Sequence, residues 1–413
     1  MSDATENNHP ETDGMSREEK RERRIRQLKH AAVGLFVVYA LLMLVWGAYD
    51  YAFVFRVSKG IKVVDGSAVR DHAPIFDHFF TNAKYEKLRP YLHYRHYVIP
   101  DGAEELKSSA FLGKNLRSVR IPDSVTKLDS GIFSGCVELE EVDLPDSVTE
   151  IRRKMFLNNH NLTRVRLPAG AKAIMDEAFR NCSGLREIVI PDGVEKIGSR
   201  AFFNCAALER VVIPESVKDI GPQAFYGCSS LRRLEIPDTV EHISGAAFRK
   251  CASLEEIRLP AGMVLARTER RARPAERRTT SGGLSGYAPD IPYTIPANPD
   301  IENSLFEDCT SLKKVVIPEG VRSIGVSSFA RCTGLEEIIL PESLQLICRN
   351  AFYGCTSLKK IVIPEGVVEI DTQAFADCTS LADVEFRSSS VNVSRTSFLG
   401  TLVPPETLQA VLK

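Results

Sequence analysis

Apolar residues recur along most of the chain at a fixed spacing, and they predict one short strand in each repeat. Leu185, Ile188 and Ile190 form a Leu-x-x-Ile-x-Ile unit whose alternate side chains share one face, as in a half-buried strand. Pro191 follows and ends the strand, because proline cannot donate to a ladder of hydrogen bonds. A valine and an isoleucine three residues apart then predict an inward-facing return segment, as at Val194 and Ile197.

Phenylalanine anchors each repeat and fixes its length. Successive anchors are 23 residues apart, except for one step of 22 and one step of 58 between Phe248 and Phe306. Cysteine follows the anchor by three residues in nine repeats, with Asn159 in its place once, and leucine follows by six. The anchors are Phe111, Phe133, Phe156, Phe179, Phe202, Phe225, Phe248, Phe306, Phe329, Phe352, Phe375 and Phe398. One unit cannot bury its apolar side chains alone, so we expect units stacked about 4.8 Å apart around a continuous core.

This order of Phe, Cys, Leu and Ile-Pro resembles the BspA-like leucine-rich repeats from about residue 97 to residue 400. The resemblance implies a β-rich repeat solenoid with a curved parallel sheet, of a kind found on secreted or surface proteins that bind host or matrix partners. It implies no catalytic residues. The chain also lacks nucleophile-elbow, zinc-protease and phosphate-loop motifs, so we expect neither enzymatic activity nor a cofactor.

An uncharged segment near the N-terminus predicts a single transmembrane helix before the solenoid. Ala31–Tyr49 has 19 residues without a charge, enough as a helix to span about 28 Å of hydrocarbon. Basic residues are concentrated between Arg17 and Lys29, which places the N-terminus in the cytoplasm and the repeats outside the cell. The alternative is a cleaved signal peptide and a secreted protein, but Val45-Trp46-Gly47 is a poor cleavage site.

The remaining segments complete a linear organisation. We expect His93 and His96, with His72 and His78 nearby, to have structural roles, because a metal site is the less favoured reading of this spacing. The predicted segments are a disordered cytoplasmic tail (1–30), the transmembrane helix (31–49), a membrane-proximal segment and N-terminal cap (50–96), a first repeat block (97–263), a basic insertion (264–302), a second repeat block (303–400) and a C-terminal cap (401–413).

The cysteine column has three interpretations. Stacked side chains on adjacent turns lie within disulfide range, but they point the same way and do not offer the required sulfur torsion. Metal binding requires four ligands that converge, which a linear ladder does not provide. We therefore favour reduced, buried thiols. Cys348 is off the column, at the position of Gly198 and Gly221, and we expect it on the outer side, where it could be modified or pair between chains.

The outward residues of the predicted strands form the candidate partner-binding face. The residue before the buried centre of the strand alternates in sign along the chain, so adjacent turns can pair charges. The residue after it is apolar in two groups, and exposed apolar strips often mark contacts with partners. Strand propensity alone also explains such residues. The candidate residues are Val189, Val212, Val316, Ile339, Val362, Arg210, Arg233, Lys314 and Lys360.

The insertion is the clearest departure from the repeat. It begins with an arginine-rich piece and continues with glycine and proline, and Tyr293–Pro296 looks like a degenerate strand that re-enters the stack. A solvated loop is the simpler interpretation of the insertion. The more specific interpretation is a basic arm that binds an acidic polymer or anionic surface. The basic arm consists of Arg267, Arg270, Arg271, Arg273, Arg277 and Arg278.

These features favour a surface-displayed binding or adhesion protein that recognises a protein or extracellular-matrix ligand. The alternative is a non-catalytic structural or scaffold protein of the cell envelope. The net charge of −1 argues against a nucleic-acid partner. The sequence predicts no oligomeric state.

Overall fold

The computed structural model describes residues 63–64, 96–99, 101–107, 110–261 and 300–409. The chain divides into two units, Met1–Ile61 and Lys62–Lys413, and all described residues belong to the second. The predicted transmembrane helix, most of the membrane-proximal segment and the basic arm lie outside the described residues. Within the described part of the chain, no helix is long and apolar enough to cross a membrane.

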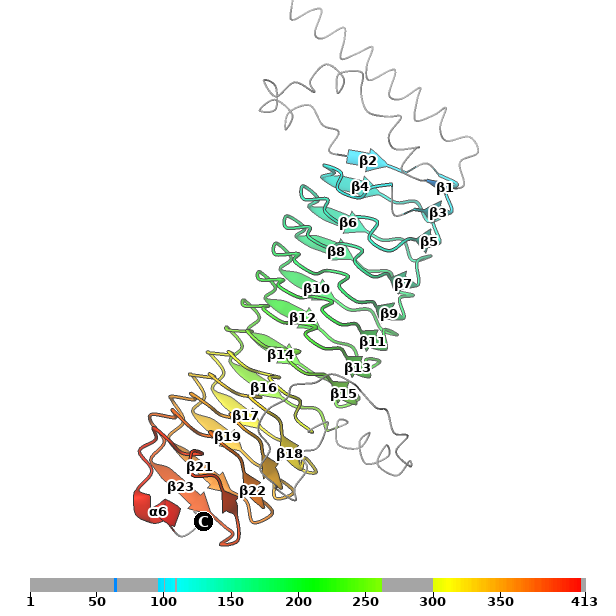
Figure 1. Ribbon diagram of the computed structural model, residues 1–413. Coiled ribbons are helices and arrows are strands. Elements are labelled where there is room, and N and C mark those ends of the chain that lie inside the picture. The colour runs from blue at the N-terminus through cyan, green and yellow to red at the C-terminus, as the bar shows by residue number, and fades with distance from the viewer. Residues whose placement is uncertain (1–62, 65–95, 100, 108–109, 262–299, 410–413) are drawn as a thin grey trace, which may run out of the picture. The chain divides into compact units, whose positions relative to one another are not determined.

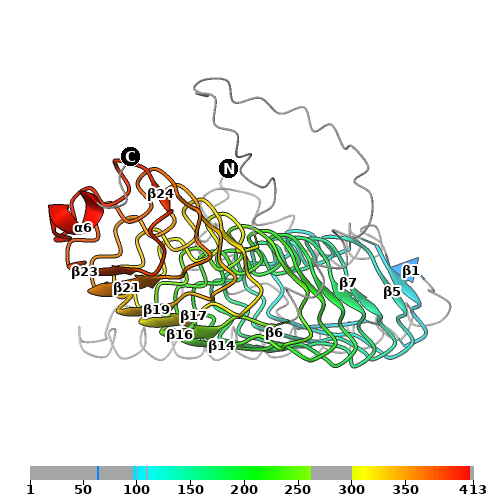
Figure 2. The same ribbon diagram turned by 90° about the horizontal axis from the view of Figure 1, so that it is seen from below.

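A repeat forms one coil that carries two short strands on different sides (Figures 1 and 2), except that the coil of β16 (Glu256–Arg258) has an isolated bridge at Ile301 in place of its second strand. We call the sheets built from the longer strands the front sheet and those built from the two-residue strands the back sheet. The front strands are β2 (His96–Val98), β4 (Ser118–Arg120), β6 (Glu141–Asp143), β8 (Arg164–Arg166), β10 (Glu187–Val189), β12 (Arg210–Val212), β14 (Arg233–Glu235), β16 (Glu256–Arg258), β17 (Lys314–Val316), β19 (Glu337–Ile339), β21 (Lys360–Ile363) and β23 (Asp383–Phe386). The back strands are β1 (Val63–Val64), β3 (Glu105–Leu106), β5 (Lys127–Leu128), β7 (Glu150–Ile151), β9 (Ala173–Ile174), β11 (Lys196–Ile197), β13 (Asp219–Ile220), β15 (His242–Ile243), β18 (Ser323–Ile324), β20 (Leu346–Ile347), β22 (Glu369–Ile370) and β24 (Asn392–Val393).

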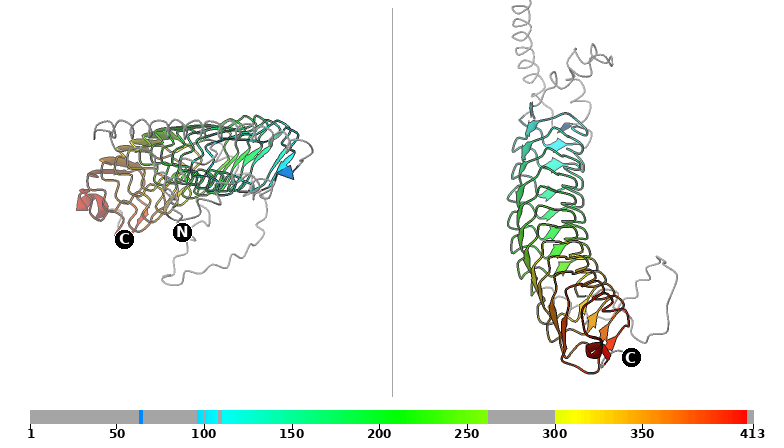
Figure 3. Two further views of the ribbon diagram at one scale, coloured as in Figure 1. Left: turned by 90° about the horizontal axis from the view of Figure 1, so that it is seen from above. Right: turned by 90° about the vertical axis from the view of Figure 1, so that its left-hand side faces the viewer.

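All strands pair in parallel with the equivalent strand of the neighbouring coil. The front sheet has three segments, β2-β4-β6-β8, β10-β12-β14-β16-β17-β19 and β21-β23. Pairing continues across the insertion, where Ile257 of β16 lies opposite Val315 of β17. On the back side, Ile301 re-enters the stack by an isolated bridge to Ile324. The coils on both sides of the insertion therefore stack directly on each other (Figure 3).

The twelve anchor phenylalanines form one aromatic ladder through the core. Eleven are fully buried and Phe398 is 6% exposed, and neighbouring ring centroids are 5.0 to 5.6 Å apart. Tyr97 packs edge-on against Phe111 at one end, and Phe386 packs edge-on against Phe398 at the other. The predicted parallel solenoid of 23-residue units is confirmed.

A left-handed turn follows each phenylalanine and aims the cysteine inward. The second residue after the anchor has a positive φ in every coil, and glycine or asparagine, which tolerate this backbone best, occupies it in most. Lys250 (φ 63°) and Arg331 (φ 56°) are the exceptions with long side chains. Arg331 belongs to the ionic cluster described below, and the backbone N–H of Lys250 donates to the carbonyl oxygen of Glu307 in that cluster.

Both ends of the stack depart from the repeat. Val63–Val64 pairs with Glu105–Leu106 and adds a strand to the first end of the back sheet. At the other end, α6 (Pro405–Gln409) follows the last coil, within the predicted C-terminal cap. Each end thus has a non-repeat segment, which is typical of solenoids whose terminal coils would otherwise expose the core.

Candidate partner-binding face

The front strands present alternate side chains to solvent because successive residues of a strand point to opposite sides. Each front strand from β6 to β19 is exposed, buried and exposed at its three positions, with Val211 as the buried centre of β12. We call the first exposed residue the leading position and the third the trailing position. The strand face is the set of outward side chains at these two positions.

The trailing position carries two exposed apolar groups, as predicted. Val189 is 58% exposed and Val212 is 37% exposed, and the two lie in register on β10 and β12. Val316 and Ile339, 42% and 45% exposed, lie in register on β17 and β19. Val362 is only half-buried rather than fully outward. We attribute this to the fourth residue of β21, which extends its pairing with β23 to the end of both strands.

The leading position carries the predicted alternation of charge, and several neighbours pair. Arg210 lies 3.2 Å from Glu187, Lys314 lies 2.9 Å from Glu337, and Lys360 lies 3.2 Å from Asp383. All six side chains are about half exposed or more, so each pair stabilises the fold by about 0.2–1 kcal/mol at most.

Arg233 differs from the other candidate cations of the strand face. It lies in register between Arg210 and Glu256, and among the described residues it forms no ion pair. Its charge is therefore balanced by solvent in the isolated chain. An exposed guanidinium without an internal partner is available for contact with a carboxylate of another molecule.

The cysteine column is a ladder of buried thiols. All ten cysteines are free and buried, which confirms the reduced-thiol interpretation. Each of the nine column thiols donates to the carbonyl oxygen of the anchor phenylalanine one coil back, as Cys182 does to Phe156 at 3.0 Å and Cys332 does to Phe306 at 3.1 Å. Burial raises the pKa of Cys205 and of Cys251 to about 12, so these thiols stay protonated and unreactive at neutral pH.

The expected outer position of Cys348 is wrong. Its side chain is fully buried, and burial raises its pKa to about 12. The close approach of neighbouring coils explains glycine at Gly221, where a Cβ would lie 2.8 Å from the carbonyl carbon of Gly198 in the coil before. The equivalent position is exposed in another coil, where Met175 is 40% exposed, so the coil around Cys348 and not the position alone buries its thiol.

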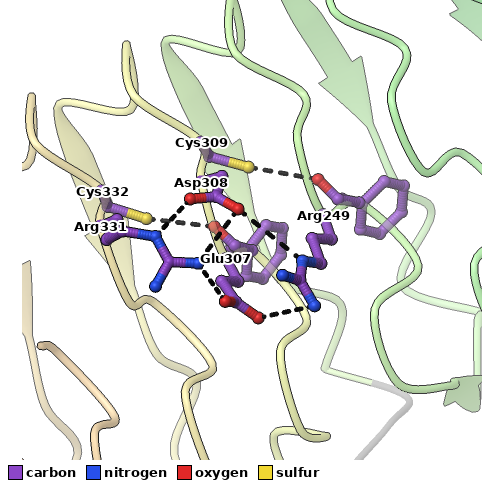
Figure 4. Close-up of polar contacts among 8 residues, drawn as sticks. Arg249, Glu307, Asp308, Cys309, Arg331 and Cys332 are labelled. Atoms are coloured by element: carbon purple, nitrogen blue, oxygen red, sulfur yellow. Dashed lines mark hydrogen bonds and ion pairs between the residues drawn. The ribbon is translucent and has the colours of Figure 1, made fainter.

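An ionic cluster joins the coils on the two sides of the insertion (Figure 4). Glu307 is 6% exposed and contacts Arg249 at 3.1 Å in the coil before and Arg331 in the coil after. Asp308 accepts from the Nε of Arg331 at 2.6 Å. Partial burial alone would raise the pKa of Asp308. The hydrogen bond from Arg331 and the nearby positive charges together lower this pKa by more than burial raises it, so the net shift is downward.

An aromatic and cationic column continues from this cluster. Phe203 stacks on Tyr226 with ring centroids 4.6 Å apart, Arg180 lies over Phe203 at 5.2 Å, and Arg249 and Lys250 lie over Tyr226. The cations cover both ends of the ring stack, so the column is a contact between coils and does not form an open platform for a ligand.

Other predicted features lie outside the described residues. These include the basic arm, Tyr293–Pro296, His72, His78 and His93. Within the described part of the chain, no group of three histidine, cysteine or acidic side chains is placed to hold a metal ion.

Comparisons with known proteins identify the family. The sequence matches the BspA type leucine rich repeat region over residues 91–208, 149–267 and 299–404. These matches cover more than half of the chain, so the protein belongs to this family. No curated protein sequence matches the chain.

Solved leucine-rich repeat proteins are similar in part. A leucine-rich repeat protein from Bacteroides ovatus is 25% identical, with a TM-score of 0.45, and the match covers 74% of this chain and 84% of that one. A leucine rich cell surface protein from Faecalibacterium prausnitzii is 22% identical, with a TM-score of 0.37 and coverage of 74% and 89%. The leucine-rich repeat protein of T. pallidum is 24% identical, with a TM-score of 0.35 and coverage of 58% and 86%.

Proposed function

We propose that the chain is a binding protein whose strand face recognises a protein or extracellular-matrix partner. The observation that carries this proposal is the pair of exposed apolar groups, Val189 with Val212 and Val316 with Ile339, each in register on adjacent strands. Burial of four such side chains would contribute a few kcal/mol at about 25 cal/mol per Å², and the charged residues around them would set orientation and specificity.

The rest of the fold serves this face as a rigid scaffold. Side chains at the trailing position cannot turn inward, because the central residue of each strand, such as Val211 or Ile338, fills the core. The parallel ladder fixes the spacing between neighbouring outward residues at about 4.8 Å. A partner therefore meets a surface that needs little ordering on binding, which reduces the entropic cost of association.

Paired arginine substitutions test the proposal. We expect V189R/V212R, V316R/I339R or both to weaken binding to at least one member of a panel of collagen, laminin and fibronectin by more than tenfold, measured by biolayer interferometry on the full-length chain. Val368→Arg is the matched control, because Val368 is also 43% exposed but precedes a back strand. Equal losses in the control and the face variants, or no loss in either face variant, would reject the strand face as the binding surface.

We further propose that Ala31–Tyr49 anchors the protein in the membrane with the repeats outside the cell. The uncharged length of this segment and the basic residues before it support this orientation. Protease treatment of intact cells should then remove the repeats and leave a tag at the N-terminus protected. Protection of the repeats would refute the orientation, and release of intact repeats into the medium would support cleavage and secretion instead.

The arginines between Arg267 and Arg278 are proposed as a basic arm that binds an acidic polymer or an anionic surface. Deletion of residues 266–288 should abolish salt-sensitive binding to heparin while the solenoid remains folded. Binding that survives the deletion would show that the arm is only a connecting loop. Capture of a partner only by chains that retain residues 1–30 would instead favour a scaffold role at the envelope.

A further inference from the structure

Charged doublets form bands of alternating sign across one half of the front sheet. In the five coils of β14 to β21, the leading position and the residue before it have the same sign, and in the coil of β23 only the leading position is charged. The bands are Arg232 with Arg233, Glu255 with Glu256, Lys313 with Lys314, Glu336 with Glu337, and Lys359 with Lys360, and a sixth coil adds Asp383. All these side chains are exposed. Each band therefore lies between bands of the opposite charge.

In the last three doublets the two members differ in their internal partners, whereas in the first two neither member forms an ion pair with a described residue. At the leading position, Lys314 pairs with Glu337 and Lys360 pairs with Asp383. The residues before that position form no ion pair with any described residue, although backbone hydrogen bonds such as Lys313 N to Glu255 O hold them in adjacent coils. If these charges served only to fix the register of adjacent strands, both members of each doublet would form ion pairs with the neighbouring coil. The outer member of each doublet is left available to another molecule.

The order of the charged bands on one copy is complementary to the order on a second copy whose stack runs in the opposite direction. Read along the stack, the six coils are positive, negative, positive, negative, positive and negative. A second copy turned by a two-fold axis that runs parallel to the strands, between the coils of β17 and β19, presents the same series backwards. Every positive band then faces a negative one. A two-fold axis along the stack would instead place like charges opposite each other.

We propose that this half of the strand face binds a second copy of the chain in an antiparallel, face-to-face dimer. Lys313 and Lys314 then face Glu336 and Glu337 of the second copy, and the same contact is made twice, as expected for an isologous interface. Val316 faces Ile339 across the axis, so apolar side chains meet at the centre. Arg233, which has no partner among the described residues, faces Asp383 at the rim.

Spacing favours a second copy over other partners. Bands of one sign recur every second coil, about 9.6 Å apart on a parallel ladder. Three residues of an extended strand rise about 9.9 Å, but side chains three apart on a strand point to opposite sides. Three residues of an α-helix rise about 4.5 Å, but with 3.6 residues per turn side chains three apart drift around the helix. Neither element therefore keeps a row of side chains aligned with successive coils. Another stack of the same coils matches both the spacing and the alternation.

The size of the face predicts a weak dimer. Six coils at about 4.8 Å and four residues at about 3.3 Å define roughly 400 Å² on each copy, against about 800 Å² per partner in a standard interface. The dimer should therefore be weak, and salt should weaken it further because its charges are exposed. This inference deepens the proposed function, since it names one occupant of the strand face, and it rests on that face being a binding surface.

Two complementary charge swaps test the dimer. K313E/K314E and E336K/E337K each place like charges across the proposed axis, so each should weaken self-association by more than tenfold. A mixture of the two variants restores opposite charges at both central contacts and should form a heterodimer. The measurement is light scattering of the purified full-length chain in a non-ionic detergent, at about 0.02 M and about 1 M salt.

The comparison among variants separates this interface from association elsewhere in the chain. A wild-type chain that stays monomeric at low salt, swap variants that dimerise like the wild type, or a mixture that stays monomeric would each overturn the proposal. Should a swap variant fail to fold, K314Q and E337Q remove charge without reversing it and should each still weaken the dimer. Two outcomes separate this inference from the proposed function. If the chain does not dimerise but binds the matrix, and V189R/V212R or V316R/I339R abolishes that binding, only this inference is rejected. If the chain dimerises but neither V189R/V212R nor V316R/I339R affects matrix binding, only the proposed matrix recognition is rejected.

Discussion

Asn159 is the one break in the cysteine column between Cys136 and Cys378, and its replacement by cysteine should stabilise the solenoid. The side chain is fully buried, and among the described residues neither Oδ1 nor Nδ2 has a hydrogen-bond partner. In the flanking coils, the thiols of Cys136 and Cys182 donate to phenylalanine carbonyl oxygens at 2.9 and 3.0 Å. Asn159 thus buries two polar groups where its neighbours bury one satisfied thiol.

The structure sets the size of the effect. A buried polar group without a partner costs about 1–3 kcal/mol, and asparagine and cysteine are close in volume, so the exchange leaves no large cavity. We expect Asn159→Cys to raise the free energy of unfolding by about 1–3 kcal/mol. The reverse change, Cys205→Asn, should lower it by a similar amount, because it removes the bond to the carbonyl of Phe179 and buries an amide.

Urea unfolding followed by circular dichroism, with a reducing agent present, measures both changes through the shift in midpoint at constant slope. The two variants control for each other, because they exchange the same residues in opposite directions and so alter the unfolded chain oppositely. The reasoning would be refuted by an Asn159→Cys variant that is no more stable than the wild type. A Cys205→Asn variant of unchanged stability would show that the thiol column contributes nothing.

Three further predictions follow from the packing and the pKa shifts. Replacement of residues 262–299 by Thr-Val-Glu, the sequence at 239–241 of the preceding coil, should leave the melting temperature unchanged within about 2 °C, because the coils already stack across the insertion; a large decrease would contradict this. Ellman's reagent at pH 8 should label none of the ten cysteines in the native chain and all of them in urea, since all are buried; rapid native labelling would disprove the ladder. Arg331→Met should lower the free energy of unfolding at pH 7 by about 1–3 kcal/mol. The pKa of Asp308 in the folded state is below its usual 3.8, so its ionised form stabilises the fold above the unfolded pKa and this contribution is lost as Asp308 protonates. The difference between the variant and the wild type should therefore shrink as pH falls below about 4, and a difference independent of pH between 7 and 2 would rule this out.

Periodicity in the sequence predicted the fold because every coil repeats the same local solution. Phe202 and Phe225 had to face the core, since a 23-residue unit has no other place for a large ring. The exposure of Val189, Val212, Val316 and Ile339 followed from the alternation of side chains along a strand. These features depend on neighbours that are one repeat away, so the sequence contains all the information needed.

Features that depend on crowding or on several coils at once were not predicted. Cys348 was placed outside because the repeat does not determine the exposure of its position, which is 40% exposed at Met175 and fully buried at Cys348. The contact of Glu307 with Arg249 and Arg331 was not predicted, because these three residues follow the anchor phenylalanine at positions where the repeat has no preferred residue. The charge bands could have been found, because in the coils of β14 to β21 the residue before the leading position repeats its sign.

Photo-cross-linking in intact cells tests most directly the claim that the strand face is the contact surface. A photoreactive phenylalanine analogue is placed singly at Val212 or Ile339 on the strand face, and at Met175 or Val368 beside back strands, all four being exposed apolar positions. We expect protein adducts at Val212 or Ile339 and none at Met175 and Val368. Where a second copy is the partner, the cross-linked product should have the mass of two chains. Adducts at Met175 or Val368 alone would contradict it.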